Sequence, residues 1–345
     1  MRLMVAACVL LCASGAVARR AERGASAAAA GELERLISEV PSGSTGHAVF
    51  GAADDGGEQL GALDPIADPA GGYLGVYHSP RRTGRGRTFR ISLARSSDLL
   101  HWTRIRVLDR DGASMPTLRR IPGTSGYLLA YEKKPRRYGN VIRIVYFRSR
   151  PDLLAGRVTA QRNLPRRFSP YADGTPTILW VRWRGSAARS LIGLGFHYQS
   201  KFRRRPAADR EAVGELAGLR RWMTLRGDQA DTALYGRGLR GNHGDWRQFS
   251  FDGFRWRVYE GQKRYDDFAT WHVLLYHPRS REMYLLSLHV GGVRLSSVGN
   301  PIVKQEPAPG GAGQVLVVTA FVFRASGPGL TGELVYYQPL GSSTR

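Results

Sequence analysis

Short apolar runs separated by turn residues fill most of this chain. From about residue 46 onward, alternating apolar and aromatic stretches are punctuated by Gly and Pro, of which the chain has 42 and 18. Short apolar runs bounded in this way are typical of β-strands. Residues 19–45 differ, because they are Ala-rich with one helical pattern from Glu32 to Val40. We therefore expect an Ala-rich leader over residues 19–45 and an all-β domain over residues 46–345.

The apolar runs fall into five similar groups. Each group opens with a small or polar residue, a turn residue that is usually Pro, and an apolar strand, and further strands follow. The groups open at Leu63, Ser114, Gly174, Gly244 and Gly299. A repeat of about fifty residues is typical of propeller blades, which cover their hydrophobic faces by stacking. The sequence predicts a five-bladed β-propeller, whereas a two-sheet sandwich leaves the repeat unexplained. Residues 206–222 lie between the third and fourth groups, and we expect an inserted helix or ordered loop there.

The first eighteen residues have the pattern of a secretory signal peptide. A short apolar run from Val5 to Leu11 precedes a small-x-small cleavage site at Ala16-Val17-Ala18. A lipoprotein signal at Cys8 or Cys12 fits less well, because almost no apolar stretch precedes the first and the large Leu11 precedes the second. Both cysteines lie in this segment, so the mature chain has no disulfide and no thiolate ligand. We expect a secreted protein, cleaved after residue 18, without a membrane span.

The net charge of the chain is +23, and arginine supplies most of it. A basic surface attracts polyanions through salt-sensitive contacts. A solvated arginine-rich surface with no such partner explains the charge more simply. Nothing in the sequence resembles a nucleic-acid-binding fold, so we expect no nucleic-acid partner, while an anionic polysaccharide stays compatible with the charge.

Polar residues recur where the first strand of each group begins. In a propeller these strands line the central channel, so their starts converge on one mouth, where a ligand pocket forms. Several carboxyl groups around one axis can hydrolyse a glycosidic bond, one protonated to release the leaving oxygen and one ionised as base or nucleophile. The residues so placed are Asp64, Ser114, Asp173, Thr175, Asp245 and Asn300.

Two blades carry a family resemblance. Asp64-Pro65, the strand from Gly72 to Tyr77 and the turn from Ser96 to Trp102 resemble the first blade of five-bladed glycoside hydrolases of the arabinanase and β-xylosidase type, family 43, with the invertases and levansucrases as cousins. Residues 114–131 resemble their second blade. The resemblance implies hydrolysis of plant or wall polysaccharide, with Asp64 as base or nucleophile.

The match to that family is incomplete in blades two and three. The family's second-blade Asp, which tunes the pKa of the acid, is replaced here by Ser114 or Met115. The family's general acid is a Glu, and the resemblance assigns that role to the shorter Asp173, which precedes Gly174-Thr175-Pro176. The sequence therefore indicates a divergent branch.

Blade four supplies two carboxylates that the family pattern does not predict. Asp245 begins its inner strand, and Glu260 ends the next strand near the same mouth. Burial beside Tyr259 and Trp256 would raise the pKa of Glu260, which makes it the preferred alternative acid. Each carboxylate also has a purely structural alternative, such as an ion pair of Glu260 with Arg257 or a turn held by Asp245.

We predict a glycoside hydrolase-like protein that binds carbohydrate and is monomeric. The alternative is a non-catalytic propeller that recognises anionic polysaccharide through arginine. No metal-ligand spacing occurs, so we expect neither a catalytic metal nor a cofactor; a structural divalent or halide ion in the channel stays compatible with the sequence. The catalytic candidates are Asp64, Asp173, Asp245 and Glu260, whereas Glu132, before two lysines, is expected to form a strand-end salt bridge. The candidates for substrate binding are Ser114, Thr175, His197, His243, Asn300 and Trp246.

Overall fold

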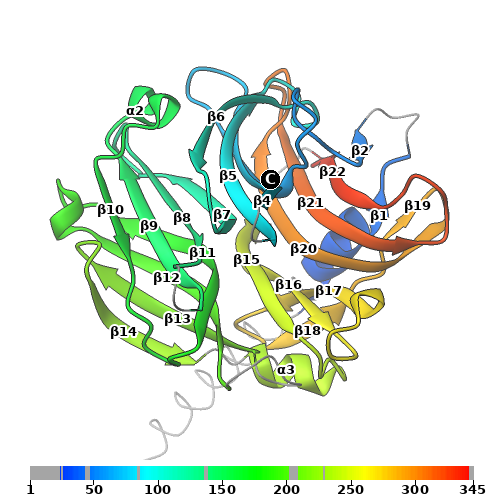
Figure 1. Ribbon diagram of the computed structural model, residues 1–345. Helices are drawn as coiled ribbons and strands as arrows, with labels where there is room; N and C mark the ends of the chain where they lie inside the picture. The colour runs from blue at the N-terminus through cyan, green and yellow to red at the C-terminus, as the bar shows by residue number, and fades with distance from the viewer. Residues whose placement is uncertain are drawn as a thin grey trace, which may run out of the picture.

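The structure is a computed structural model of the 345-residue chain (Figure 1). It describes residue 24 and residues 26–42, 47–83, 86–135, 139–201, 209–227 and 230–341. The predicted signal peptide, residues 1–18, lies outside these residues. Within the described segments, no helix is long and apolar enough to cross a membrane.

Four four-stranded antiparallel sheets and one six-stranded sheet form five blades around a central axis (Figure 1), which confirms the predicted five-bladed propeller. Blade one contains β3 (Gly61–Ala67), β4 (Tyr73–Thr83), β5 (Gly86–Ser96) and β6 (Thr103–Asp109). Blade two contains β7 (Ala113–Arg120), β8 (Tyr127–Lys133), β9 (Val141–Phe147) and β10 (Ala160–Asn163), with helix α2 (Arg150–Ala155) before the last strand. Blade three contains β11 (Ala172–Arg182), β12 (Leu191–Gln199), β13 (Asp209–Ala217) and β14 (Arg221–Gly227).

Helix α3 (Ala230–Gly236) connects blade three to blade four, which contains β15 (His243–Phe251), β16 (Phe254–Gln262), β17 (Trp271–His277) and β18 (Glu282–Leu285). Blade five contains β20 (Val293–Pro307), β21 (Gln314–Ala325), β22 (Gly332–Pro339) and β2 (Ala48–Phe50). The outermost strand of this blade therefore comes from the beginning of the domain, and Val49 pairs with Val335. This pairing closes the ring of blades.

Hydrophobic cores form between neighbouring blades. Val76 and Leu93 of blade one are fully buried and pack in one cluster with Leu118 and Leu129 of blade two. Similar clusters join blades two and three, three and four, four and five, and five and one. Each blade therefore covers the faces of its neighbours, as expected for a repeat that cannot bury its surface alone.

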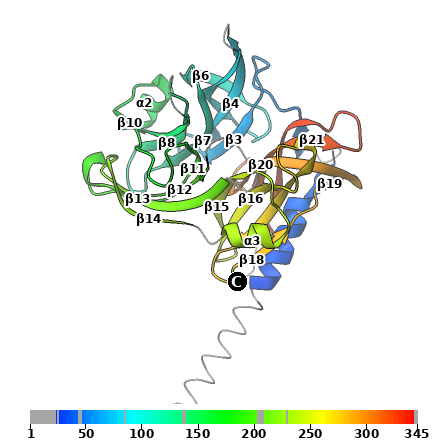
Figure 2. The same ribbon diagram turned by 60° about the horizontal axis from the view of Figure 1, so that its bottom comes forward.

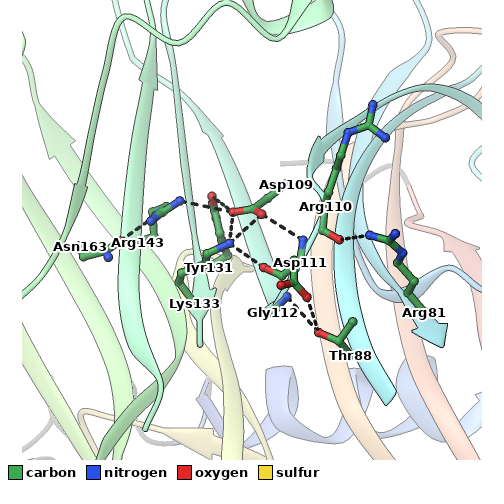
Figure 3. A network of polar contacts seen from close by, with 10 residues as sticks. All are labelled: Arg81, Thr88, Asp109, Arg110, Asp111, Gly112, Tyr131, Lys133, Arg143 and Asn163. Atoms are coloured by element: carbon green, nitrogen blue, oxygen red, sulfur yellow. Dashed lines mark hydrogen bonds and ion pairs between the residues drawn. The ribbon is translucent and has the colours of Figure 1, made fainter. Parts of the chain in front are cut away.

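A partly buried polar network also joins blades one and two (Figure 3). The carboxylate of Asp109, at the end of β6, accepts hydrogen bonds from the Lys133 ammonium at 2.7 and 2.8 Å. The Tyr131 hydroxyl donates to the same carboxylate at 2.9 Å, and Arg143 lies 3.4 Å away. Charged groups thus reinforce the apolar contact between these two blades.

Part of the predicted leader belongs to the domain. Residues 26–38 form a helix that lies against blades four and five (Figure 2). Leu33, Leu36 and Ile37 are fully buried in the core that these blades share. Strand β1 (Glu39–Val40) follows and pairs with β19 (His289–Val290). The helical pattern predicted from Glu32 to Val40 falls largely within this helix, whose apolar face completes the core instead of forming a separate leader.

The segment over residues 206–222 was expected to be an inserted helix or loop, and the structure corrects this. Its described part contains β13 and the start of β14, which are the third and fourth strands of blade three. Glu215 and Gly214 interrupt the apolar pattern of β13. This interruption made the strand hard to recognise, although all nine of its residues pair with β12.

Candidate functional site

A backbone bulge opens the inner strand of every blade. The pairing between the first two strands breaks after Gly61, Ser114, Gly174, His243 and Gly299. The residue that follows the first position of the bulge has a left-handed backbone in four blades: Ala62 (φ 48°), Met115 (φ 53°), Thr175 (φ 39°) and Asn300 (φ 51°). Asp245 lies within the corresponding break in blade four. Bulges of this kind redirect side chains and backbone N–H groups, here toward one mouth of the channel.

The bulge moves Asp64 away from that mouth. Alignment by Pro matches Asp64-Pro65 with Met115-Pro116, but the strand pairing matches Asp64 with Thr117, because both follow the bulge. The residue that corresponds to Met115 is Ala62, two positions earlier. Asp64 is therefore two residues further along the inner strand than the resemblance implied.

The surroundings of Asp64 are those of a structural carboxylate. Its side chain is 0% exposed, and the Lys304 ammonium lies 2.5 Å from Oδ1. The backbone N–H of Leu118 donates to Oδ2 at 2.8 Å. Asp64 does not line the cavity that contains the other three catalytic candidates. The ion pair with Lys304 explains its burial without any role in catalysis.

The predicted mouth is a cavity of about 350 Å³ that is lined mainly by blades two to five. Three of the four predicted catalytic carboxylates lie in it. A fourth carboxylate in the cavity, Glu132, was not among the predicted site residues. The acidic residues that line the cavity are Glu132, Asp173, Asp209, Asp245 and Glu260.

Glu132 is the most heavily hydrogen-bonded of these carboxylates. The hydroxyl of Ser114 donates to Oε2 at 2.8 Å, and the amide of Asn140 donates to the same oxygen at 3.0 Å. The backbone N–H of Thr175 donates to Oε1 at 2.9 Å. A Cβ on Gly174 would clash with Oε1, so only glycine allows this approach. Several donors from two blades thus hold this buried carboxylate in one orientation.

Thr175 connects Glu132 to Asp245. Its hydroxyl lies 2.5 Å from Oδ1 of Asp245 and 3.3 Å from Oε1 of Glu132. Oδ2 of Asp245 is buried without a hydrogen-bond partner among the described residues. Burial raises the pKa of Asp245 to about 6, and the hydrogen bond from Thr175 opposes that rise. Thr175 is itself fully buried in the wall of the cavity, where it holds the two carboxylates in position.

Glu260 lies at the contact between blades four and five. The backbone N–H of Asn300 donates to Oε2 at 2.5 Å, and the N–H of Asp245 also donates to the carboxylate. Burial raises the pKa of Glu260 well above its usual value, and repulsion by Asp245 raises it further. The charge of Asp245 thus favours a protonated Glu260 beside an ionised Asp245.

Asp173 is a third carboxyl group with an altered pKa. Burial raises its pKa to about 7, which the charges of His197 and Arg166 partly offset. Its Oδ1 is buried, and no described group donates a hydrogen bond to it. A carboxyl group that changes protonation near neutral pH is suited to proton transfer.

The predicted substrate-binding residues divide into two groups. Ser114, His197, His243 and Asn300 line the cavity, and Nδ1 of His197 lies 3.1 Å from the carbonyl of Gly244. This contact requires a proton on Nδ1, so Nε2 is free to accept a hydrogen bond when the ring is neutral. Burial lowers the pKa of His243 to about 3.

Trp246 was predicted to bind substrate, and the structure corrects this. It is 0% exposed and stacks on Tyr259, with ring centroids 5.6 Å apart. The Arg257 guanidinium covers its ring at 4.5 Å. The ring therefore belongs to the core between blades three and four, because the tryptophan side chain turns away from the mouth on its strand.

An aromatic wall faces the carboxylates from blades four and five. Phe268 is 51% exposed, and its ring centroid lies 5.4 Å from that of Phe323. Trp271 stacks on Phe323 at 6.4 Å with an interplanar angle of 21°. These three side chains line the same cavity as Asp245 and Glu260. The cavity therefore combines an acidic side with an apolar side.

A recurring dipeptide could have revealed Glu132. The second strand of four blades contains an aromatic residue followed by a polar one: Tyr77-His78, Tyr131-Glu132, Phe196-His197 and Tyr259-Glu260. In three of these blades, the polar side chain accepts a hydrogen bond from a bulge N–H of the next blade, namely Met115, Thr175 and Asn300. Glu132 and Glu260 are thus equivalent residues of the repeat. His78, which also lines the cavity, was missed for the same reason.

Known structures share this fold, although no protein-family model and no curated protein matches the sequence. The GH43_1 enzyme from Xanthomonas citri, complexed with xylotriose, is 10% identical with a TM-score of 0.52, over 86% of this chain and 91% of that one. The GH43 endo-arabinanase from Bacillus licheniformis is 10% identical with a TM-score of 0.52, over 85% and 98%. The α-L-arabinofuranosidase from Lactobacillus brevis is 10% identical with a TM-score of 0.50, over 81% and 90%. The chain is therefore similar in fold to these glycoside hydrolases.

Proposed function

We propose that this chain is a glycoside hydrolase-like protein that cleaves glycosidic bonds of plant or wall polysaccharide. The observation that carries the proposal is the convergence of Asp173, Asp245 and Glu260, all with raised pKa values, in one cavity at the mouth of the propeller. Burying carboxyl groups costs stability, and strongly altered pKa values cluster at functional sites. The fold, shared with glycoside hydrolases, makes sugar hydrolysis the first reaction to test.

Glu260 and Asp245 are assigned the two catalytic roles. Glu260, whose pKa is raised well above its usual value by burial and by Asp245, is the protonated acid that gives its proton to the leaving oxygen. Asp245, with a pKa of about 6, is ionised at neutral pH and serves the attacking side. Glycoside hydrolysis requires one protonated and one ionised carboxyl group on either side of the scissile bond. Asp64 has no role in this assignment.

The remaining cavity residues suit a sugar. The aromatic wall of Phe268, Trp271 and Phe323 offers an apolar surface on which the C–H face of a sugar ring can stack. His197 and Glu132 offer polar groups opposite that wall for sugar hydroxyls. A cavity of about 350 Å³ accepts a short segment of a glycan chain.

The test is release of reducing sugar from a panel of arabinans, xylans and wall polymers. The wild-type chain is compared with Asp245→Asn and with Asp55→Asn, an exposed residue at the outer edge of blade one. We expect release by the wild type and by Asp55→Asn, and a loss of roughly 100-fold or more in Asp245→Asn. Equal rates in all three proteins would contradict the assignment.

The same panel distinguishes the alternative of a non-catalytic binder. A propeller that only recognises anionic polysaccharide through arginine releases no sugar and binds with an affinity that falls steeply with salt. Binding that is strong, salt-sensitive and unaffected by Asp245→Asn, together with absent hydrolysis, would replace the enzyme proposal by this one.

We also propose that the protein acts outside the cell, on the basis of the signal-peptide pattern in residues 1–18. Expression of the full chain in a secreting host should give a mature N-terminus at Arg19. N-terminal sequencing of the secreted protein tests this, and retention of the uncleaved chain inside the cells would contradict it.

A further inference from the structure

Three potential metal ligands meet beside the cavity, at the junction of blades three and four. Glu211 lies on β13, Asp231 on α3, and His243 at the start of β15. One ligand atom of each residue lies within 4.8 Å of those of the other two. Three residues far apart in the sequence thus converge from three separate elements, which a purely local turn or ion pair does not require.

The histidine has the hydrogen bonding of a metal ligand. His243 is 1% exposed, and its Nε2 lies 3.2 Å from the hydroxyl of Tyr235. Its Nδ1 is buried and has no hydrogen-bond partner among the described residues. A metal-bound imidazole characteristically has one nitrogen held by a hydrogen bond while the other binds the ion. The convergence of three ligand atoms and this buried, unpartnered nitrogen both point to a bound ion.

The carboxylate of Asp231 is held in place by a backbone N–H group. The N–H of Glu211 donates to Asp231 at 3.1 Å to Oδ1 and 3.4 Å to Oδ2. This contact fixes Asp231, in the first turn of α3, against the strand that carries Glu211. The side chain of Arg210 points to the Tyr235 ring, with its guanidinium 5.2 Å from the centroid. The same guanidinium donates a hydrogen bond to the Tyr235 hydroxyl, which contacts Nε2 of His243.

We propose that Glu211, Asp231 and His243 bind a divalent first-row transition-metal ion, with Zn²⁺ as the ion that this donor set suits best. One imidazole nitrogen and two carboxylate oxygens leave a fourth position for water, as in three-residue zinc sites. Ca²⁺ and Mg²⁺ prefer sites made of oxygen alone. The site is separate from the proposed catalytic pair, so it stands independently of the proposed hydrolase function.

The ion would hold the acidic side of the cavity in a fixed position. His243 lines the cavity and stands two residues before Asp245 on the same strand. Binding to Glu211 and Asp231 would tie this strand to blade three and to α3, and hold the bulge that carries Asp245. We assign the ion a structural role, because binding to the folded state alone stabilises that state.

The experiment measures metal content and thermal stability of the full chain. Protein stripped with EDTA is dialysed against Zn²⁺, Ca²⁺ or Mg²⁺, the bound metal is counted by mass spectrometry, and Tm is recorded. We expect one Zn²⁺ per chain and a higher Tm with Zn²⁺ than with Ca²⁺ or Mg²⁺. Asp231→Asn and Glu211→Gln should bind Zn²⁺ roughly 100-fold more weakly or worse, and Glu215→Gln, a half-buried residue on the same strand, should bind as the wild type does.

Asp231 is only half-buried, so Asp231→Asn keeps the proposal testable even where a change of the buried Glu211 prevents folding. Failure of the wild type to retain Zn²⁺ would overturn the proposal. Equal Zn²⁺ binding by Asp231→Asn and Glu215→Gln would overturn it as well, and preference for Ca²⁺ would overturn the choice of ion. None of these readouts depends on sugar hydrolysis.

Discussion

Blades one and four begin with the same bulge but use it differently. In blade one the bulge carries Ala62, and the carboxylate Asp64 follows two residues later and pairs with Lys304. In blade four the bulge itself carries Asp245, which faces the cavity beside Glu260. A short displacement along an inner strand, from inside the break in pairing to the residue where pairing resumes, therefore separates a carboxylate that lines the cavity from one buried in an ion pair.

The two blades also differ in how their buried carboxylates are compensated. Asp64 has a cation at 2.5 Å, whereas Asp245 and Glu260 lie beside each other and are held by hydrogen bonds from Thr175 and Asn300. Neighbouring carboxylates of raised pKa destabilise a folded protein above those pKa values. A fold tolerates such an unfavourable arrangement where function requires it. The neighbouring carboxylates of blade four are therefore better evidence for a functional site than the Asp64-Pro65 match of blade one.

Among changes that test this contrast between blades one and four, Glu260→Gln is expected to have the largest effect. Glutamine keeps an acceptor for the Asn300 N–H but cannot give a proton to a leaving group, so we expect kcat to fall by roughly 100- to 10,000-fold. Stability at neutral pH should stay close to that of the wild type, because Glu260 is already protonated there, and should be higher at pH values where the wild-type Glu260 ionises beside Asp245. Steady-state kinetics on the responsive polysaccharide and urea unfolding measure both.

Glu282→Gln is the matched control for this prediction, because Glu282 is exposed on the outer strand of the same blade. It should retain wild-type kinetics. Full activity of Glu260→Gln together with loss of activity in Asp173→Asn would move the role of the acid from blade four to blade three.

Asp64→Asn should show the opposite behaviour. The change leaves the Lys304 ammonium, whose side chain is 21% exposed, without its anionic partner. We expect a loss of about 2–4 kcal/mol in the free energy of unfolding, measured by urea denaturation, with kcat per folded molecule unchanged. A large loss of kcat at unchanged stability would return Asp64 to the catalytic role that its Asp-Pro sequence implied.

Asp173→Asn should alter how stability depends on pH. Burial raises the pKa of Asp173 to about 7, above its unfolded value of about 3.9. The folded state then holds the proton more tightly, so this contribution to stability is complete below about pH 4 and is lost as the pH rises through about 7. Asparagine cannot ionise, so the variant should gain roughly 2–4 kcal/mol on the wild type between pH 4 and pH 8.

Urea unfolding of both proteins across this pH range measures that difference. Asp245 changes stability in the same direction in both proteins, so the comparison isolates Asp173. Parallel pH curves would show that Asp173 keeps an ordinary pKa and would remove it as a proton donor.

The sequence predicted the architecture better than the site. Five groups of strands were visible because the turn residues and apolar runs recur, and Asp173, Asp245 and Glu260 were found because they stand near strand ends. Asp64 was misplaced because a bulge adds residues to one strand without a sequence signal, so alignment by Pro shifted the register. Glu132 was taken for a strand-end salt bridge because its part in the site depends on Thr175 of the next blade, a contact that only the packing of blades creates.

Thr175→Val is expected to have the smallest effect, and it tests how blade three supports blade four. Valine keeps the shape of threonine but removes the hydroxyl that donates to Asp245, so the pKa of Asp245 should rise further. If Asp245 acts in its ionised form, the acidic limb of the kcat/KM profile moves to higher pH, and the rate at neutral pH falls by roughly 10-fold, about 1.4 kcal/mol. Thr177→Val, two residues along the same strand and buried beyond the bulge, is the control and should leave the profile in place. If the acidic limb of Thr175→Val stays at the wild-type pH, the ionisation of Asp245 does not produce that limb. Thr175 of blade three would then have no role in the catalytic function of blade four.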